Sequence, residues 1–166
     1  MKKLIILFQF VFILALSNCI SENEKVELNP DISIEFPGSY KYREAQGMRI
    51  FEFSSRSDYV VTSIYPIEGA DTLSSDQLAH VLESNAVGFI KGFNGKEIYS
   101  SGKAINDTAI NEFIFEYNKN DSLFSVFGNA FVHNNNMYIL AFRTIKPVTN
   151  KAQKRMDRFF NSILFK

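Results

Sequence analysis

Three long apolar runs near the C-terminus constrain the fold of this chain more than any other feature. They span Thr108–Tyr117, Leu123–His133 and Met137–Ile145, and Asn-rich segments that suit tight turns join them. The second and third runs are apolar at alternate positions on both faces of a strand. A strand that is apolar on both faces must be covered on both. The runs therefore predict central strands of a sheet with a helix layer on each side.

Shorter patterns predict the rest of the sheet and its helices. Further strands are expected, from apolar alternation or β-branched runs, at Ile32–Phe36, Met48–Ser54, Asp58–Tyr65 and Lys96–Ala104. Ser74 with Gln77 three residues later is a capping box, and apolar residues at helical spacing follow it. A second helix is expected after Pro147. We therefore predict an α+β fold, an α/β/α sandwich with a mainly antiparallel sheet of about six or seven strands and two main helices.

The N-terminus has the order of an export signal. Lys2 and Lys3 precede the apolar segment Leu4–Leu16, which is too short to span a bilayer. Leu16-Ser17-Asn18-Cys19 follows and resembles the lipobox of bacterial lipoproteins, in which the cysteine is acylated and becomes the first residue of the mature protein. Asn18 departs from the usual Gly or Ala. The alternatives are a buried N-terminal segment and an ordinary secreted protein in which Cys19 is incidental.

These features divide the chain into a signal peptide at 1–18, acylated Cys19 with a flexible tether through residue 30, and a single domain at 31–166. The tether is polar and acidic. Acidic residues just after the cysteine resemble the surface-export signals of Bacteroidetes lipoproteins. The resemblance implies an exported protein that is lipid-anchored in the bacterial cell envelope, at the outer membrane on its periplasmic or surface side. Its expected partners are the membrane, through the lipid on Cys19, and an envelope protein.

Charge and cysteine content exclude several classes of function. The chain has 18 basic and 18 acidic residues, and removal of Lys2 and Lys3 with the signal leaves 16 against 18, a net charge of −2. This balance predicts no nucleic-acid partner. One cysteine excludes an internal disulfide and a cysteine-built zinc site, and we expect no metal or cofactor. Lys151, Lys154, Arg155 and Arg158 are predicted to face outward on the last helix, where they would add modest attraction to an anionic membrane, about 1 kcal/mol per basic group.

The sequence contains no catalytic constellation. Glu112 and Glu116 share one face of a predicted strand about 13 Å apart, which is too far for a glycosidase pair, and they suit a solvated strand edge. His80 and His133 have no partner placed to orient them. Arg143 is a charge in an apolar strand, and we expect it to pair with a strand glutamate or to lie near the strand end. We therefore predict that the protein is not an enzyme; Glu112, His133 and Arg143 clustered in a cleft would contradict this.

Three short motifs support a resemblance to a known fold family. They are Ile34-Glu35-Phe36-Pro37-Gly38, Met137-Tyr138-Ile139-Leu140 and Phe159-Phe160-Asn161-Ser162-Ile163. With the element order, they resemble the α/β/α sandwich of PsbP-type photosystem proteins, the Ran-binding Mog protein and DcrB-like bacterial lipoproteins, over about Asp31–Lys166. The family's members mostly act as accessory, non-catalytic binding modules. Neither metal ligands nor a Ran-binding surface has a counterpart in this chain. A cystatin-like or NTF-type cone is the alternative fold.

Three triplets match a modification motif. Asp71-Thr72-Leu73, Asp107-Thr108-Ala109 and Asp121-Ser122-Leu123 have the Asp-Ser/Thr-apolar pattern that Bacteroidetes glycosylate on exported proteins. The pattern predicts glycosylation at Thr72, Thr108 and Ser122. The preference of Asp and Thr for turns and caps would also produce such triplets.

Two functions are compatible with these features. The first is a non-enzymatic envelope lipoprotein that acts as an accessory or protein-binding module. The alternative is a carrier or sensor of a small apolar ligand, suggested by 17 Phe and 7 Tyr residues. A deep pocket lined by Phe and Tyr would favour the carrier, and an exposed apolar patch would favour a protein partner.

Overall fold

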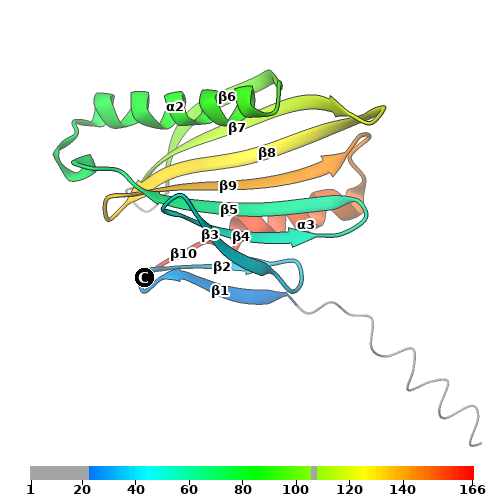
Figure 1. Ribbon diagram of the computed structural model, residues 1–166, viewed down its shortest axis with the longest axis horizontal. Coiled ribbons are helices and arrows are strands. Elements are labelled where there is room, and N and C mark those ends of the chain that lie inside the picture. Colours follow the sequence, from blue (N-terminus) through cyan, green and yellow to red (C-terminus); the bar gives the residue numbers. More distant parts are fainter. Residues whose placement is uncertain (1–22, 106–107) are drawn as a thin grey trace, which may run out of the picture.

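The computed structural model describes residues 23–105 and 108–166. In chain order, its elements are β1 (Glu24–Asn29), β2 (Ile32–Phe36), β3 (Lys41–Ala45), β4 (Met48–Ser54), β5 (Asp58–Pro66), η1 (Ala70–Thr72), α2 (Ser75–Gly92), β6 (Lys96–Ile105), β7 (Thr108–Lys119), β8 (Ser122–His133), β9 (Asn136–Ile145), α3 (Asn150–Asn161) and β10 (Leu164–Phe165). A seven-stranded sheet has the order β3-β4-β5-β9-β8-β7-β6, and all its neighbouring strands are antiparallel. The predicted α+β fold is confirmed (Figure 1).

The Asn-rich segments make the tight turns that set the register of the central strands. Asn120 and Asp121 join β7 to β8, and Asn134 and Asn135 join β8 to β9; all four residues have positive φ. Two successive residues with positive φ form the turn whose twist matches that of the flanking strands, and Asn and Asp adopt this conformation at low cost. The predicted hairpins are therefore confirmed.

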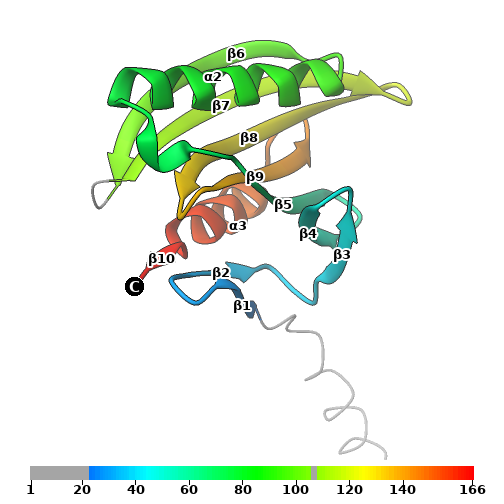
Figure 2. The ribbon, with the colours of Figure 1, turned by 60° about the vertical axis from the view of Figure 1, so that its left-hand side comes forward.

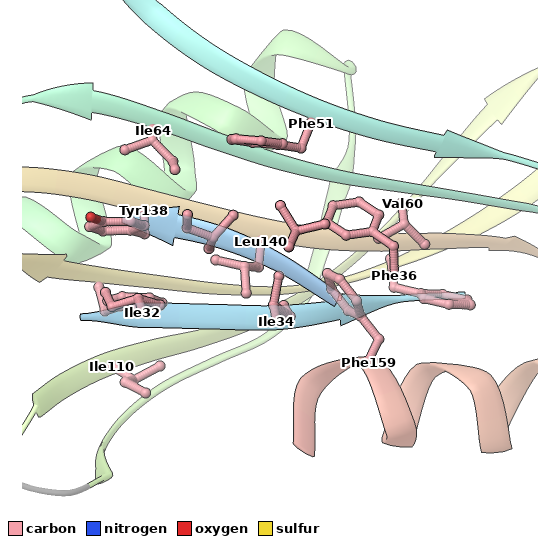
Figure 3. Close-up of a cluster of buried hydrophobic side chains, with 14 of the residues drawn as sticks. Ile32, Ile34, Phe36, Phe51, Val60, Ile64, Ile110, Tyr138, Leu140 and Phe159 are labelled. Atoms are coloured by element: carbon pink, nitrogen blue, oxygen red, sulfur yellow. The ribbon is translucent and has the colours of Figure 1, made fainter. Parts of the chain in front are cut away.

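Each face of the sheet packs into its own hydrophobic core. On one face, Val126 and Ala130 of β8 pack in the core that contains Leu82, Ala86 and Ile90 of α2. On the other face, Phe131 of β8 packs in the core that contains Phe159 of α3 and side chains of the small sheet. Figure 3 shows Phe159 of this core beside Ile34 and Phe36 of β2. Strand β8 thus contributes to both cores, as its two-sided apolar pattern predicts.

Side-chain caps begin both helices. The Ser74 hydroxyl accepts from the Gln77 backbone N–H, and the Gln77 side chain accepts from the Ser74 N–H, which confirms the predicted capping box. The Thr149 hydroxyl accepts from the Ala152 N–H at the start of α3. These bonds satisfy backbone donors that the first turn of a helix leaves free.

The second face of the sheet has a composite cover. Helix α2 lies over one face, whereas α3 and a three-stranded sheet of order β1-β2-β10 share the other (Figure 2). The twelve residues of α3 span only about 18 Å, so the helix cannot cover that face alone. The Phe36 ring on β2 packs edge-on against Phe159 on α3, with centroids 5.6 Å apart. The prediction of a helix layer on this face is therefore correct only in part, because α3 shares the face with the three-stranded sheet.

The folded domain begins earlier than residue 31. Glu24–Asn29 forms β1 and pairs with β2, and the side chains of Val26 and Leu28 are buried. The prediction of a tether through residue 30 is wrong for this segment, because two alternating apolar positions among acidic residues already suffice for a strand that packs on a core. The predicted signal peptide and Cys19 lie outside the described residues.

The contact between Gly128 and Phe113 tests the packing between β7 and β8. Phe113 lies directly opposite Gly128, and its buried ring occupies the space that a Cβ at position 128 would need. We expect Gly128→Ala to lower the free energy of unfolding by roughly 1–3 kcal/mol, because the ring must move within a packed core. Nothing lies within 4 Å of a Cβ at Gly102 on β6. Gly102→Ala should therefore change the unfolding free energy by less than about 0.5 kcal/mol. Equal effects in urea unfolding would contradict this packing.

Candidate functional site: the open edge of strand β6

The charged residues singled out in the sequence do not form one site. Glu112 lies opposite Asn129 on β8, whereas Arg143 lies opposite Val126. Because successive residues of a strand point to opposite faces, Glu112 and His133 lie on the face toward α3, and Arg143 lies on the face toward α2. The arrangement that would have contradicted the non-enzymatic prediction is therefore not observed for these three residues.

Glu112 and Glu116 lie on an interior strand rather than at the edge of the sheet. Glu112 forms an ion pair with Lys103, and Glu116 forms one with Lys146. The prediction of edge glutamates is wrong in position, since β6 lies outside β7. Their accessibility comes from the part of this face that α3 leaves uncovered. At this exposure such pairs contribute little to stability.

Arg143 is held by aromatic rings. Its guanidinium carbon lies 4.9 Å from the Tyr59 ring centre and 5.0 Å from the Phe124 ring centre, and Nη1 donates to the Tyr117 hydroxyl at 3.2 Å. Burial, together with a hydrogen bond to Glu52, raises the pKa of Tyr59 to about 12. The expectation of a glutamate partner is wrong, because the negative faces of two rings stabilise the cation instead. The alternative, a position near the strand end, is confirmed, since Arg143 lies two residues before the end of β9.

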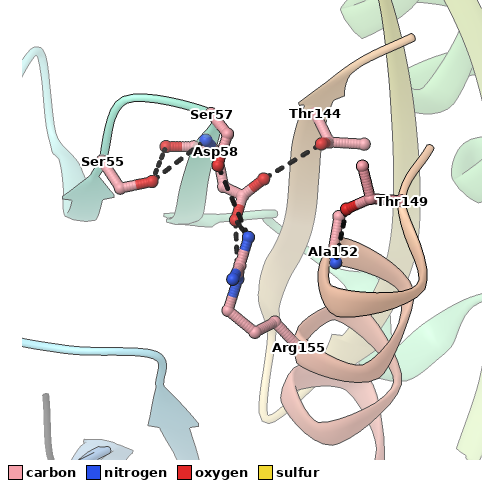
Figure 4. Close-up of polar contacts among 7 residues, drawn as sticks. All are labelled: Ser55, Ser57, Asp58, Thr144, Thr149, Ala152 and Arg155. Atoms are coloured by element: carbon pink, nitrogen blue, oxygen red, sulfur yellow. Dashed lines mark hydrogen bonds and ion pairs between the residues drawn. The ribbon is translucent and has the colours of Figure 1, made fainter. Parts of the chain in front are cut away.

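An ion pair with a fully buried carboxylate joins the start of β5 to helix α3 (Figure 4). The Asp58 side chain at the start of β5 is fully buried and accepts from Arg155 Nε at 2.7 Å and from Thr144 Oγ1 at 2.9 Å. Arg155 was predicted to face solvent, but it turns toward Asp58. The sequence carries no signal for this pair, because its members are 97 positions apart. All these partners lie within the fold, so the cluster is structural.

The histidines do not build a metal site. His80 is exposed on α2, and His133 Nε2 lies 3.7 Å from Asp31 Oδ2. Within residues 23–105 and 108–166, no group of three His, Cys, Asp or Glu side chains is placed to hold a metal ion. No helix in the same part of the chain is long and apolar enough to cross a membrane.

A groove of about 250 Å³, lined equally by polar and apolar groups, lies between the β6–β8 part of the sheet and α3. Tyr99, Ile114, Phe127, Met156 and Phe160 provide its apolar lining. Polar groups of Lys103, Glu112, Asn129, Asp157 and Asn161 surround them. Such an apolar floor with a polar rim can hold an apolar side chain and fix its position.

A hollow of about 550 Å³, also of mixed polarity, lies on the other side of β6, beneath α2. Glu83 of α2, Ser100 and Lys103 of β6 and Asn111 of β7 line it. Asn111 is only 6% exposed, and its Oδ1 accepts from the Ser100 hydroxyl at 3.3 Å, while its Nδ2 has no hydrogen-bond partner among the described residues. A buried amide donor without a partner is costly, so an incoming acceptor would be favoured here.

Strand β6 separates these two hollows and ends the seven-stranded sheet. No described strand pairs with its outer edge. Ile98 and Tyr99 on β6 are 54% and 46% exposed, next to a register shift between Glu97 and Tyr99. An unpaired strand edge presents a row of backbone donors and acceptors to another strand. Sequence reasoning predicted β6 as a strand, but only the sheet order shows that it is an edge.

The predicted glycosylation positions lie at turns and strand starts. Thr72 is exposed in η1, and its hydroxyl donates to the Gly69 carbonyl at 2.7 Å. Thr108 and Ser122 are partly exposed at the first positions of β7 and β8. Nothing in this geometry tests whether they are modified, and the three sites stay predictions.

Comparison with known proteins identifies the fold. No family model and no curated protein matches the chain. Solved structures that resemble it include cyanobacterial PsbP from Synechocystis sp. PCC 6803, with a TM-score of 0.66, 8% identity and coverage of 90% of this chain and 95% of that one. LpqN of Mycobacterium tuberculosis has a TM-score of 0.55 and 13% identity, with 86% and 91% covered. The Saccharomyces cerevisiae Ran-binding protein Mog1p has a TM-score of 0.52 and 9% identity, with 87% and 96% covered. The chain therefore has a PsbP/Mog-like α+β fold.

We expect the Asp58–Arg155 ion pair to contribute to the free energy of unfolding. Arg155→Ala should lower the unfolding free energy by roughly 3 kcal/mol, because it leaves the fully buried Asp58 carboxylate without its cation. Asp58→Ala should cost less than this, because the Arg155 side chain is 28% exposed and water can solvate its charge. The double variant should cost less than the sum by about 1 kcal/mol or more. The exposed pair of Arg43 and Glu52, 2.9 Å apart, is the control. Arg43→Ala should cost less than about 1 kcal/mol in the same denaturant titration. Additive effects at positions 58 and 155 would contradict direct coupling.

Proposed function

We propose that this chain is an exported, lipid-anchored envelope protein whose domain binds an extended segment of another envelope protein along β6. The domain acts as a non-enzymatic accessory module, and acylated Cys19 holds it at the membrane. The observation that carries the binding proposal is the position of β6, whose outer edge pairs with no described strand, between a groove on one face of the sheet and a hollow on the other.

The two hollows suit the side-chain alternation of a strand. A peptide that pairs with β6 would extend the sheet, and its successive side chains would point to opposite faces. Side chains on one face would lie beside Tyr99, at the β6 end of the groove, while those on the other would lie beside Ser100, at the β6 end of the hollow. Backbone hydrogen bonds supply affinity in this mode, and the alternate side chains supply specificity. The preferred segment is therefore an extended one with side chains on both faces that combine apolar contacts with hydrogen bonds.

The cavities fit a protein segment better than a small apolar ligand. The groove, at about 250 Å³, is smaller than the roughly 300–1,000 Å³ of ordinary small-molecule sites. The larger hollow is lined by Glu83, Ser100 and Asn111, which suit polar partners. Most of the large aromatic residues pack against one another in the two cores. The aromatic content that suggested a carrier is thus accounted for by the interior.

Solved proteins of the same fold support a role as an accessory module. Mog1p is a Ran-binding protein, and LpqN is involved in cell envelope biogenesis. These descriptions belong to those proteins, and their likeness to this chain is one of fold. Because proteins with this architecture serve as binding or envelope proteins, we assign a binding role at the envelope to this chain. The lipobox-like sequence before Cys19 supplies the argument for the anchor.

Two tyrosines on opposite edges of the sheet give a matched test. Tyr99 on β6 is 46% exposed, and Tyr42 on the other edge strand, β3, is 49% exposed. A photoreactive phenylalanine analogue at position 99 should cross-link one discrete envelope protein in native cells, while the same analogue at position 42 should not.

The cross-linked segment then allows a quantitative measurement. Made as a synthetic peptide, it should bind the full protein, and Tyr99→Ala should weaken the binding about tenfold, a loss of about 1.4 kcal/mol. Tyr42→Ala should leave the affinity unchanged. A peptide that binds both variants equally well would contradict the assignment of β6 as the binding edge.

A further inference from the structure

The two main helices carry opposite charge, although the whole chain is neutral. Helix α3 contains Lys151, Lys154, Arg155 and Arg158 against one acidic residue, Asp157. Helix α2 contains Asp76 and Glu83 against Lys91. The helices pack on opposite faces of the sheet (Figure 2). Helix α3 therefore has a net charge of +3 (four basic, one acidic) and α2 one of −1 (one basic, two acidic). The neighbouring strands β1 and β2 carry Glu24, Glu27 and Glu35, so the basic character on this side belongs to the outward face of α3, and such an asymmetry orients a protein in an external field.

The basic side is a continuous surface, which we name the α3 basic surface. It is an open hollow of about 410 Å³ lined by Asn23, Asn150, Lys151, Lys154, Arg155 and Arg158. Arg155 is neutralised by Asp58, and Arg158 forms an ion pair with Glu35 at 3.2 Å. Lys151 and Lys154 are exposed and form no ion pair with any residue in the described part of the chain. Two uncompensated ammonium groups thus face outward from this surface.

The chain reaches the α3 basic surface at Asn23. The Asn23 side chain lines the surface and donates to Glu35 Oε2 at 3.3 Å, next to Arg158. Hydrogen bonds from Asn23 and Arg158 lower the pKa of Glu35. Cys19 precedes Asn23 by four residues, and four residues span at most roughly 14 Å. An acyl chain on Cys19 would therefore hold this surface near the headgroups of the bilayer.

We infer that the α3 basic surface rests on an anionic membrane leaflet, with Lys151 and Lys154 against phospholipid phosphate groups. This inference rests on the proposed acylation of Cys19 and adds an orientation to it. The short reach from Cys19 places Asn23 at most roughly 14 Å from the anchored cysteine. Both lysines can therefore approach the lipid to within a Debye length of about 8–10 Å, where attraction is strong. The same orientation turns α2 toward the aqueous phase. The lipid then supplies attachment, and the lysines fix which side of the domain faces the membrane.

Lysine labelling of the full, acylated protein in vesicles tests this orientation. The protein is reconstituted into phosphatidylcholine vesicles with or without phosphatidylglycerol and treated with a water-soluble amine reagent. We expect the labelling rate of Lys151 and Lys154 to fall at least about threefold on the anionic vesicles. Contact with a lipid phosphate shields the amine from the reagent, and each lysine near such a surface gains about fivefold in binding. Lys91 and Lys96, exposed elsewhere, should react equally on both. About 1 M salt should remove the difference, since the Debye length then falls to about 3 Å.

A charge-reversal pair provides the matched control. Lys25 lies opposite Glu35 in the β1–β2 ladder and reports on the same side of the domain. Its protection on anionic vesicles should be lost in the Lys151→Glu/Lys154→Glu variant and kept in Lys91→Glu/Lys96→Glu, which changes net charge equally. Protein that floats with vesicles but labels equally on both lipids would overturn the orientation and leave the anchor standing. Native protein that carries no acyl chain would overturn both the anchor and the orientation. If Lys151 and Lys154 bind a protein instead, they would be protected only when that protein is added, and this result would also overturn the lipid assignment.

Discussion

The requirement to cover both faces of the central strands determines most of this structure. Strands β8 and β9 are apolar on both faces, and their buried side chains reach into two separate cores. Each fully buried aliphatic or aromatic side chain contributes about 1.5–3 kcal/mol, so an uncovered face would unfold the domain. One face is satisfied by α2. The other needs α3 together with β1, β2 and β10, which explains why chain segments from both ends meet on that side (Figure 1).

The sequence predicts the elements whose signals are local. The strands from Thr108 to Ile145, their Asn turns and the capping box at Ser74 follow from periodicity and turn chemistry, and the structure agrees. Features that depend on distant residues could not be predicted. Asp58 and Arg155 meet across 97 positions, and Arg143 finds two rings instead of a carboxylate. The β6 edge belongs to the same class, since its exposure depends on the order of all seven strands.

The second face of the sheet is only partly covered near β6, whereas near β1 the small sheet and α3 cover it. These two parts of the domain therefore present different surfaces. Near β6, the short α3 leaves a groove beside a strand edge that no strand of residues 23–105 and 108–166 pairs with. Near β1, the chain enters beside four basic side chains of α3. An attachment side and a recognition edge on separate parts of one small domain would let a tethered protein face the membrane and engage a partner together. No catalytic group is required for this behaviour.

Intact mass spectrometry of the protein extracted from its own cells in mild detergent distinguishes an anchored from an unanchored protein. We expect a denatured mass equal to residues 19–166 plus acyl chains, with further increments only if Thr72, Thr108 or Ser122 carry sugars. Under native conditions, mass that is lost on denaturation would reveal a bound partner. A denatured mass without lipid would contradict the account, because the protein would then be exported without an anchor.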